Sequence, residues 1–122
     1  MTEKRAYPRL RLTRKVGVRL SSGEVVYLWS HDLSVAGLQL LSEYIAEMGD
    51  VLRLFLVLRR PGSHEHVRVD MSARVAHITY SGEHRCYRIG CAILEFQGNG
   101  RALYETWIED QMLRYGILQA SG

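Results

Sequence analysis

The sequence predicts a mainly β domain: a small, closed, six-stranded antiparallel barrel with a flexible basic arm before it and one α-helix after it. Six short apolar segments are separated by turn signals, which is typical of antiparallel strands. The segment that follows them has apolar residues at helical spacing. Closing such a sheet on itself and packing one helix against it buries both apolar surfaces.

Residues 1–11 are expected to form the arm. They have no regular apolar period, and Pro8 lacks an N–H group and disfavours helical backbone at Tyr7. No acidic residue occurs between Lys4 and Arg19, whereas the cationic side chains there are Lys4, Arg5, Arg9, Arg11, Arg14, Lys15 and Arg19. This stretch should attract an anion. Charge alone does not tell whether the anion is a nucleic acid, a membrane surface or a nucleotide.

Six strands are expected over residues 12–20, 25–30, 38–42, 51–58, 67–75 and 85–96. In the first, apolar side chains alternate with others from Leu12 to Leu20. The alternation is strict from Val67 to Val75, which predicts one face toward the core and one toward water. Turns are expected at residues 21–24, 59–63 and 80–83, where Gly, Ser and Pro gather.

A closing helix is expected over residues 98–116, with Asn99 as its N-cap and Gly116 at its end. Its apolar stripe consists of Leu103, Tyr104, Trp107, Ile108, Met112 and Tyr115. We expect this stripe to join the core, although surplus apolar residues there, or at Tyr44 and Ile45, are an alternative partner surface. The chain is thus expected to be one domain, with an arm (1–11), a barrel (12–97), a helix (98–116) and a tail (117–122).

Several function classes lack the residues they need. The histidines do not form a metal pattern, because His64 and His66 have no third ligand nearby in the sequence. Ser34 lacks the strand–turn–helix context of a nucleophile, and no phosphate-binding glycine loop is present. We therefore expect no enzyme, no metal and no cofactor.

The compartment is expected to be the cytoplasm. No apolar run approaches the roughly 18 residues that span a bilayer, and charge rather than an apolar signal region follows Met1. Cys86 and Cys91, the two cysteines, lie five residues apart in one expected strand, so their side chains point to opposite faces. Both are expected to be reduced and partly buried.

The segment from His31 to Gly37 interrupts an apolar run with polar side chains, and we expect it to be a binding site between two strands. In extended chain Asp32 and Ser34 point to the same side. Gly37 permits a positive φ or a close approach of the backbone. A carboxylate accepts from the N1–H and N2–H groups of guanine, a pattern that adenine lacks.

Arginines in the arm offer the complementary chemistry. Arg5 and Arg9 each present a planar fork of donors that fits the O6/N7 edge of guanine or two phosphate oxygens. By chance this composition gives about 1.6 Arg-x-x-x-Arg pairs but only about 0.03 Asp-x-Ser-x-x-Gly motifs, so the second motif is the diagnostic one. We expect the arm to fold over Asp32 and Ser34 with a guanine-containing ligand between them.

These motifs, together with a last strand that reads Tyr-Arg-Ile-Gly-Cys-Ala-Ile-Leu-Glu-Phe over residues 87–96, resemble the PilZ domain family. The resemblance extends from Lys4 to about Tyr115. It implies a six-stranded barrel with a helix that binds the bacterial second messenger cyclic di-GMP. It further implies a ligand-gated adaptor that relays this signal to a downstream protein, which the sequence does not identify.

The resemblance implies a role for each candidate residue. Arg5 and Arg9 would hold guanine edges and phosphate, and the barrel side of the site would be formed by Asp32, Ser34 and Gly37. Lys4 precedes the first motif arginine, a position associated in the family with binding a stacked pair of ligand molecules. Lys4 and Arg74 are further candidate ligand contacts.

Two other hypotheses remain open. One is a nucleic-acid-binding barrel whose arm follows the phosphates, which exposed aromatic side chains on a strand face would favour. The other is an interaction adaptor that binds proteins without a nucleotide. The intact motifs argue against this adaptor. Nucleic acid is not expected, because the sequence offers few candidates for such aromatic side chains, and membrane insertion is not expected, because no apolar run is long enough.

Overall fold

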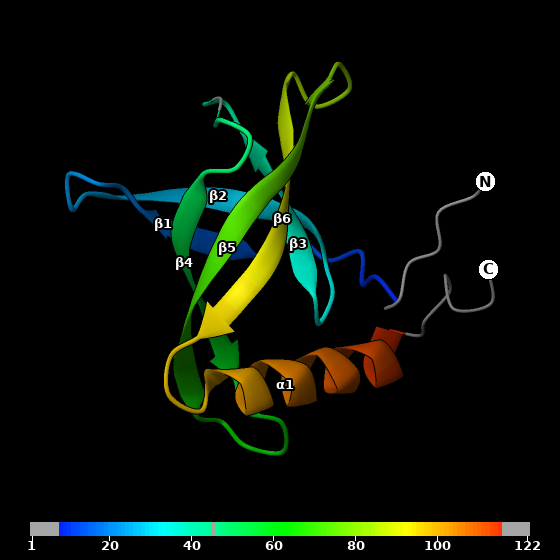
Figure 1. Ribbon diagram of the computed structural model, residues 1–122. Coiled ribbons are helices and arrows are strands. Elements are labelled where there is room, and N and C mark those ends of the chain that lie inside the picture. Colours follow the sequence, from blue (N-terminus) through cyan, green and yellow to red (C-terminus); the bar gives the residue numbers. More distant parts are fainter. Residues whose placement is uncertain (1–7, 45, 116–122) are drawn as a thin grey trace.

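The computed structural model describes residues 8–44 and 46–115. It contains six strands and one helix (Figure 1): β1 (Lys15–Arg19), β2 (Val25–Leu33), β3 (Gly37–Ser42), β4 (Val51–Arg59), β5 (His66–Ser81), β6 (Cys86–Phe96) and α1 (Gly100–Tyr115). The strands form a closed antiparallel barrel, and the helix follows the last strand. The predicted fold class is confirmed.

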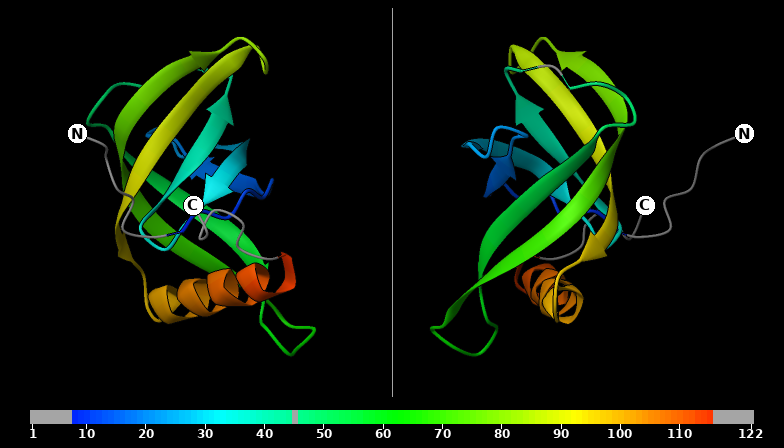
Figure 2. Two further views of the ribbon diagram at one scale, coloured as in Figure 1. Left: turned by 90° about the vertical axis from the view of Figure 1, so that its right-hand side faces the viewer. Right: turned by 60° about the vertical axis from the view of Figure 1, so that its left-hand side comes forward.

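The strand order around the barrel is β1-β2-β3-β6-β5-β4. Most neighbouring strands in the barrel are also consecutive in the chain and form hairpins. The exceptions are the pair β3–β6 and the pair β4–β1, which closes the barrel. The closing contact joins three residue pairs, Gly17–Phe55, Val18–Leu54 and Arg19–Arg53, whereas β4 and β5 pair along the whole of β4. Figure 2 shows the long, strongly twisted β5 and β6 crossing the barrel in both views.

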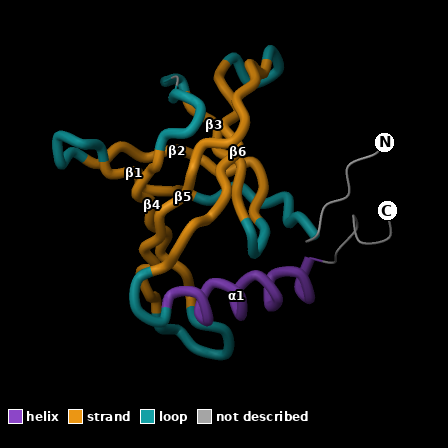
Figure 3. The backbone as a smooth tube through the Cα atoms, in the orientation of Figure 1, coloured by secondary structure: helices purple, strands orange, loops and turns teal. Residues whose placement is uncertain are grey.

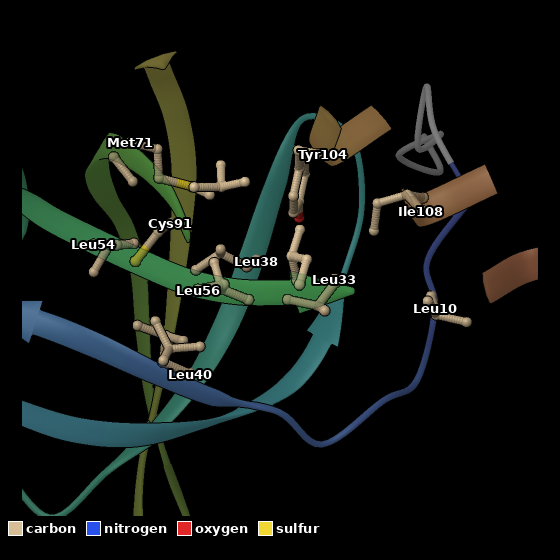
Figure 4. Close-up of a cluster of buried hydrophobic side chains, with 14 of the residues drawn as sticks. Leu10, Leu33, Leu38, Leu40, Leu54, Leu56, Met71, Cys91, Tyr104 and Ile108 are labelled. Carbon is tan, nitrogen blue, oxygen red and sulfur yellow. The ribbon is translucent and has the colours of Figure 1, made fainter. Parts of the chain in front are cut away.

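The core fills the barrel and the space between it and α1, which lies across one end (Figures 1 and 4). The inward positions of the strands supply most of it, including Val16, Val18, Leu38, Leu40, Leu54, Leu56, Val69, Met71, Val75 and Ile89. From α1, Tyr104, Trp107, Ile108 and Met112 are buried, as the apolar stripe predicts, whereas Tyr115 is exposed. The strict alternation from Val67 to Val75 is also confirmed, with Val69, Met71, Ala73 and Val75 inside.

The first strand begins later than predicted, at Lys15, because residues 10–14 lie along the end of β2. Leu10 is buried and pairs with Leu33, each backbone N–H donating to the other's carbonyl oxygen at 2.7 and 2.9 Å. The fully buried Ser30 accepts from the Arg14 N–H at 2.8 Å and donates to the Leu12 carbonyl oxygen. The prediction of a flexible arm up to residue 11 is therefore wrong for its last residues, which are fixed to the barrel.

Two strands run further than the sequence predicts. β2 continues through Asp32 to Leu33, so Asp32 lies in a strand and not between two strands. β5 continues to Ser81. Each contains a β-bulge, at His31 in β2 and at Ala76 in β5, which lets a long strand follow the curvature of a small barrel.

Both cysteines are free and buried. Burial raises the pKa of the Cys91 thiol to about 11. Within residues 8–44 and 46–115, no helix combines the length and the apolar character that crossing a membrane needs.

Candidate ligand-binding site

The carboxylate of Asp32 lies on the outer side of the barrel wall because of the bulge at His31. Ser30 points into the barrel, and without an extra residue Asp32 would point there too. The register shift after Ser30 instead places Leu33 in the core, opposite Leu38. Asp32 is nevertheless only 6% exposed, because neighbouring side chains cover it from outside.

Arg9 is one of these neighbours. Its Nη1 lies 3.1 Å from Asp32 Oδ1 and 3.3 Å from Oδ2, and the bridge between Leu10 and Leu33 fixes the backbone next to it. Arg9 is half-buried and uses only Nη1 in this ion pair. The structure thus joins one residue of each predicted motif, and the rest of the Arg9 fork is left to offer further donors.

His31 contacts the same carboxylate from its other side, with Nδ1 3.2 Å from Asp32 Oδ2. A carboxylate can only accept, so Nδ1 carries the hydrogen of this bond. Asp32 is thereby held between a guanidinium and an imidazole, which fixes the direction in which its oxygens face.

Ser34 lies in the tight β2–β3 loop, and its hydroxyl is used there. Its Oγ accepts from the Gly37 N–H at 3.2 Å and from the Ala36 N–H at 3.3 Å, and lies 3.2 Å from the Gly37 carbonyl oxygen, to which it donates. Asp32 and Ser34 were expected to present a matched pair of groups on one face. The structure shows instead that Ser34 closes the loop on its own backbone.

Gly37 starts β3 at a point where the chain runs very close to β6. A Cβ atom at this position would lie 2.4 Å from the Cys91 carbonyl oxygen. Of the two roles predicted for this glycine, the close approach of the backbone is the one observed. The Ile93 N–H also donates to the Ala36 carbonyl oxygen at 2.9 Å, so the loop is fastened to β6 on both sides of Gly37.

The loop is also tied to the helix. The Tyr104 hydroxyl donates to the Ser34 carbonyl oxygen at 2.8 Å, from a ring that is wholly buried among core side chains (Figure 4). Burial raises the pKa of Tyr104, and the negative charge of Asp32 raises it further. In Figure 3 the β2–β3 loop extends toward α1, consistent with this contact.

The other predicted residues fall in two groups. Lys4 and Arg5 lie outside the described residues. Arg74 is exposed on the outer face of β5, where it pairs with Ala92 of β6, which in turn pairs with Gly37. One strand therefore separates Arg74 from the Asp-x-Ser-x-x-Gly loop, on the same wall of the barrel.

Two residues of the site were not predicted. His31 orients the carboxylate, and only its position next to Asp32 pointed to it. Tyr104 holds the loop from the core. A tyrosine among the buried positions of an apolar stripe does carry a signal, because a buried hydroxyl needs an acceptor.

The group that these residues form is suited to an organic anion with hydrogen-bond donors. Asp32 accepts, the free part of the Arg9 fork donates, and the Arg-rich arm supplies positive charge. No group of three His, Cys, Asp or Glu side chains in the described part of the chain is placed to hold a metal ion.

A closed antiparallel barrel with a helix over one end, and with an arginine of its N-terminal arm paired to an aspartate on the outer wall, defines a small β-barrel recognition domain. The chain belongs to the PilZ domain family, whose model matches residues 3–110. No curated protein matches the sequence.

Solved structures share this fold at low sequence identity. The *Bacillus subtilis* inhibitor of motility (MotI/DgrA) has a TM-score of 0.73 at 20% identity, over 93% of this chain and 54% of that one. MrkH of *K. pneumonia* in complex with c-di-GMP has a TM-score of 0.66 at 18% identity, again over 93% and 54%. The present chain thus spans about half the length of these two proteins.

The isolated PilZ domain of YcgR from *Escherichia coli*, solved with c-di-GMP, is similar over 98% of both chains, with a TM-score of 0.61 and 16% identity. The six strands and the helix therefore match nearly the whole of that solved domain. At these identities the likeness concerns the fold.

Proposed function

We propose that this PilZ domain is a receptor for cyclic di-GMP and acts as a ligand-gated adaptor for a partner protein. The ligand would lie between the arm and the outer wall of the barrel. Arg5 and Arg9 would hold guanine edges and phosphate, and Asp32 would accept from the N1–H and N2–H groups of guanine. Because the messenger is intracellular, we expect the protein to act in the cytoplasm.

One observation carries this proposal: the ion pair between Arg9 and Asp32. It brings the Arg-x-x-x-Arg and Asp-x-Ser-x-x-Gly motifs to one place on the wall, although they are 23 residues apart in the chain. Family membership and the neighbours that were solved with c-di-GMP support the same ligand.

Ser34 and Gly37 have a supporting role in this proposal. Their hydrogen bonds and close packing set the shape of the loop, and the ligand would contact the backbone that they hold. Lys4 and Arg74 are proposed as outer contacts. A basic residue at Lys4 is also compatible with the binding of a stacked pair of ligand molecules.

The switch would act on the arm. Residues 10–14 are hydrogen-bonded to β2 and Arg9 is paired with Asp32, so the proposed switch concerns residues 1–8. Ordering residues costs about 1–2 kcal/mol each in backbone entropy, and contacts to the ligand would offset this cost. The surface seen by a partner would then change near residues 1–9.

A nucleic-acid-binding barrel is the second candidate, because the structure places exposed aromatic side chains on an outer strand face. Tyr27 and Trp29 both protrude from β2. Nucleic-acid binding would fall steeply with salt and would not depend on guanine. A protein adaptor without a nucleotide is the third, and it predicts no response to any nucleotide.

A calorimetric titration with cyclic di-GMP tests the proposal, with cyclic di-AMP and GTP as controls. We expect micromolar or tighter binding of cyclic di-GMP, equivalent to about −8 kcal/mol, that persists at moderate salt. Equal binding of cyclic di-AMP, or no binding of any of the three, would refute it. Amide exchange of the arm should slow on ligand addition, and unchanged exchange would rule out the switch.

A further inference from the structure

The barrel has two neighbouring hollows that the proposed nucleotide site does not use, one over β1, β2 and β4 and one over β1, β4, β5 and β6. The first, here called the apolar hollow, has a volume of about 270 Å³. It is lined by Thr13, Arg14, Lys15, Gly17, Tyr27, Trp29, Phe55 and Val57. Tyr27 is 57% exposed and Trp29 51%, so large apolar side chains lie open to water here. Apolar side chains grouped in this way indicate a binding surface.

Gly17 makes the floor of the apolar hollow. It pairs with Tyr27 on one side and with Phe55 on the other, and the Phe55 ring lies over it. A Cβ atom at Gly17 would lie 2.2 Å from Cζ of Phe55. The missing side chain therefore lets Phe55 lie flat, while Tyr27 meets it edge to face with ring centroids 6.1 Å apart.

The second hollow, here called the arginine hollow, adjoins the first at Phe55 and has a volume of about 370 Å³. Its charged lining residues are three arginines, Arg19, Arg53 and Arg68, and two acidic residues, Asp70 and Glu95. Arg19 and Arg53 are direct partners across β1 and β4, and like charges in this position destabilise a sheet. Among the ion pairs of the described residues, none includes Arg19 or Arg53.

The two hollows call for an occupant with two properties. The arginine hollow can accept further negative charge, because it has three arginines against Asp70 and Glu95, and Asp70 already pairs with Arg68 at 3.0 Å. The neighbouring apolar hollow, with a volume of about 270 Å³, has room for a single large side chain. Exposed Trp, Tyr and Arg side chains are also the residues that carry most binding energy at protein interfaces.

We infer that this face docks an acidic segment of a partner protein, with an aliphatic or aromatic side chain in the apolar hollow and carboxylates in the arginine hollow. The inference goes beyond nucleotide binding, since it concerns residues outside the proposed nucleotide site. The surface is nevertheless close to that site along the chain: Arg14 lines the apolar hollow, and residues 10–14 lead from it to Arg9.

Single-stranded nucleic acid fits this face less well than an acidic peptide does, although the face is both basic and aromatic. A base needs a free ring face on which to stack. Phe55 has Gly17 under one face and the Arg68 guanidinium over the other, with Cζ 3.9 Å from the ring centroid. Lys15 lies over the Tyr27 ring, its Nζ 5.3 Å from the centroid. An acidic peptide can pair with these cations while they remain in place.

The test measures fluorescence anisotropy of a short labelled peptide in which a Leu-Phe-Leu centre is flanked by Asp and Glu. Two probes serve as comparisons: the same peptide with Lys for each acidic residue, and a labelled oligothymidylate. All titrations are made without cyclic di-GMP, so that failure of the proposed function leaves this test unaffected. We expect the acidic peptide to bind and the lysine peptide not to bind.

Matched variants locate the binding. Arg53→Glu should weaken the acidic peptide at least about tenfold, because it reverses a charge in the arginine hollow. Arg59→Glu makes the same change at the end of the same strand, outside both hollows, and should have little effect. Trp29→Ala should weaken binding similarly, whereas Tyr80→Ala, at another exposed aromatic position, on β5, should not. Circular dichroism checks that each variant is folded.

Three results would overturn the inference. They are a wild-type protein that does not bind the acidic peptide, equal losses in Arg53→Glu and Arg59→Glu, and tighter binding of the oligothymidylate than of the peptide. The last result would assign the face to nucleic acid.

Discussion

The guanidinium of Arg9 and the carboxylate of Asp32 contact each other directly, with Nη1 3.1 Å from Oδ1. The two groups expected to bind the ligand therefore satisfy each other in its absence. A guanine that donates to Asp32 must share the carboxylate with Arg9 or displace the arginine toward a phosphate. The free energy of this ion pair is thus subtracted from the affinity for the ligand, and Arg9 is held beside the site.

Removing either partner should prevent ligand binding. Arg9→Ala and Asp32→Ala, and separately Arg5→Ala, are each expected to reduce cyclic di-GMP binding below detection by calorimetry. Charge-assisted hydrogen bonds are worth about 1.5–3 kcal/mol each, and the ordering of the arm leaves little surplus. Near-wild-type affinity in Arg9→Ala or Asp32→Ala would refute a shared site.

Two control variants keep this test specific. Arg59→Ala removes a cation from an exposed strand position, and Asp70→Ala removes a carboxylate that is also paired to an arginine. Both should retain cyclic di-GMP binding. A loss in either would mean that general charge, rather than the two motifs, determines the affinity.

The same ion pair should contribute to stability. Asp32 is buried, so Arg9→Ala leaves its charge with His31 as the remaining partner. We expect the free energy of unfolding to fall by about 1–2 kcal/mol, with a coupling of similar size in a double-mutant cycle with Asp32→Ala. Urea unfolding of the four proteins measures it. A coupling near zero would show that the pair is not formed in solution.

Gly37 should tolerate no side chain. In Gly37→Ala the new Cβ would meet the Cys91 carbonyl oxygen, so β3 and β6 would have to separate locally. We expect a loss of about 2 kcal/mol or more in the free energy of unfolding, measured in urea. Gly82→Ala is the matched control, because nothing lies within 4 Å of a Cβ atom there. Equal stability of the two variants would contradict the close approach.

The hydroxyl of Tyr104 should matter for the loop more than for the core. Tyr104→Phe keeps the buried ring but leaves the Ser34 carbonyl oxygen without its donor. The expected cost is about 1 kcal/mol in the free energy of unfolding, together with weaker cyclic di-GMP binding. Tyr115→Phe removes an exposed hydroxyl and should change neither quantity. If both variants bind the ligand as the wild type does, the helix does not position the loop.

Alkaline pH should destabilise the protein through Cys91. Burial raises the pKa of this thiol in the folded state to about 11, from about 9. Below pH 9 the thiol is protonated in both the folded and the unfolded state, and its contribution to the free energy of unfolding is fully present. Between about pH 9 and pH 11 the unfolded chain loses the proton first, so the free energy of unfolding should fall by about 2–3 kcal/mol.

Urea unfolding at a series of pH values measures this slope. Cys91→Ala should be less stable at neutral pH because it leaves a cavity, and its slope above pH 9 should be shallower. Tyr104 acts in the same direction, since burial raises its pKa as well, and this part remains in the variant. Parallel slopes would show that Cys91 is not responsible.

The sequence predicts the elements of the fold well because the periods are clear. The alternation at Val67 to Val75 and the helical stripe around Trp107 both appear as expected. The bulge at His31 could not be predicted, because it depends on how β2 must curve against β3. That bulge decides whether Asp32 points into the core or out toward a ligand.

The site could be predicted in composition but not in geometry. The motifs identify Arg9 and Asp32, and the structure places them in contact. Ser34 hydrogen-bonds within its own loop, because a hydroxyl in a loop that tight meets its own backbone first. Tyr104 was placed in the core correctly, but its hydrogen bond spans 70 residues, a distance over which local patterns carry no information.

The short contact between β1 and β4 has a consequence for the stability of the protein without the proposed acidic partner. Three residue pairs close the barrel there, and one of them joins two arginines that repel each other. The barrel should open most readily between β1 and β4, and the amides that join these two strands should exchange faster than those of the other strand pairs.

A carboxylate bound to Arg19 and Arg53 would span this junction and remove the repulsion. By mass action, any molecule that binds only the closed barrel raises its stability as its concentration rises. Melting temperature would therefore report occupancy of this face directly. The chain should be measurably more heat-resistant in its complex than alone.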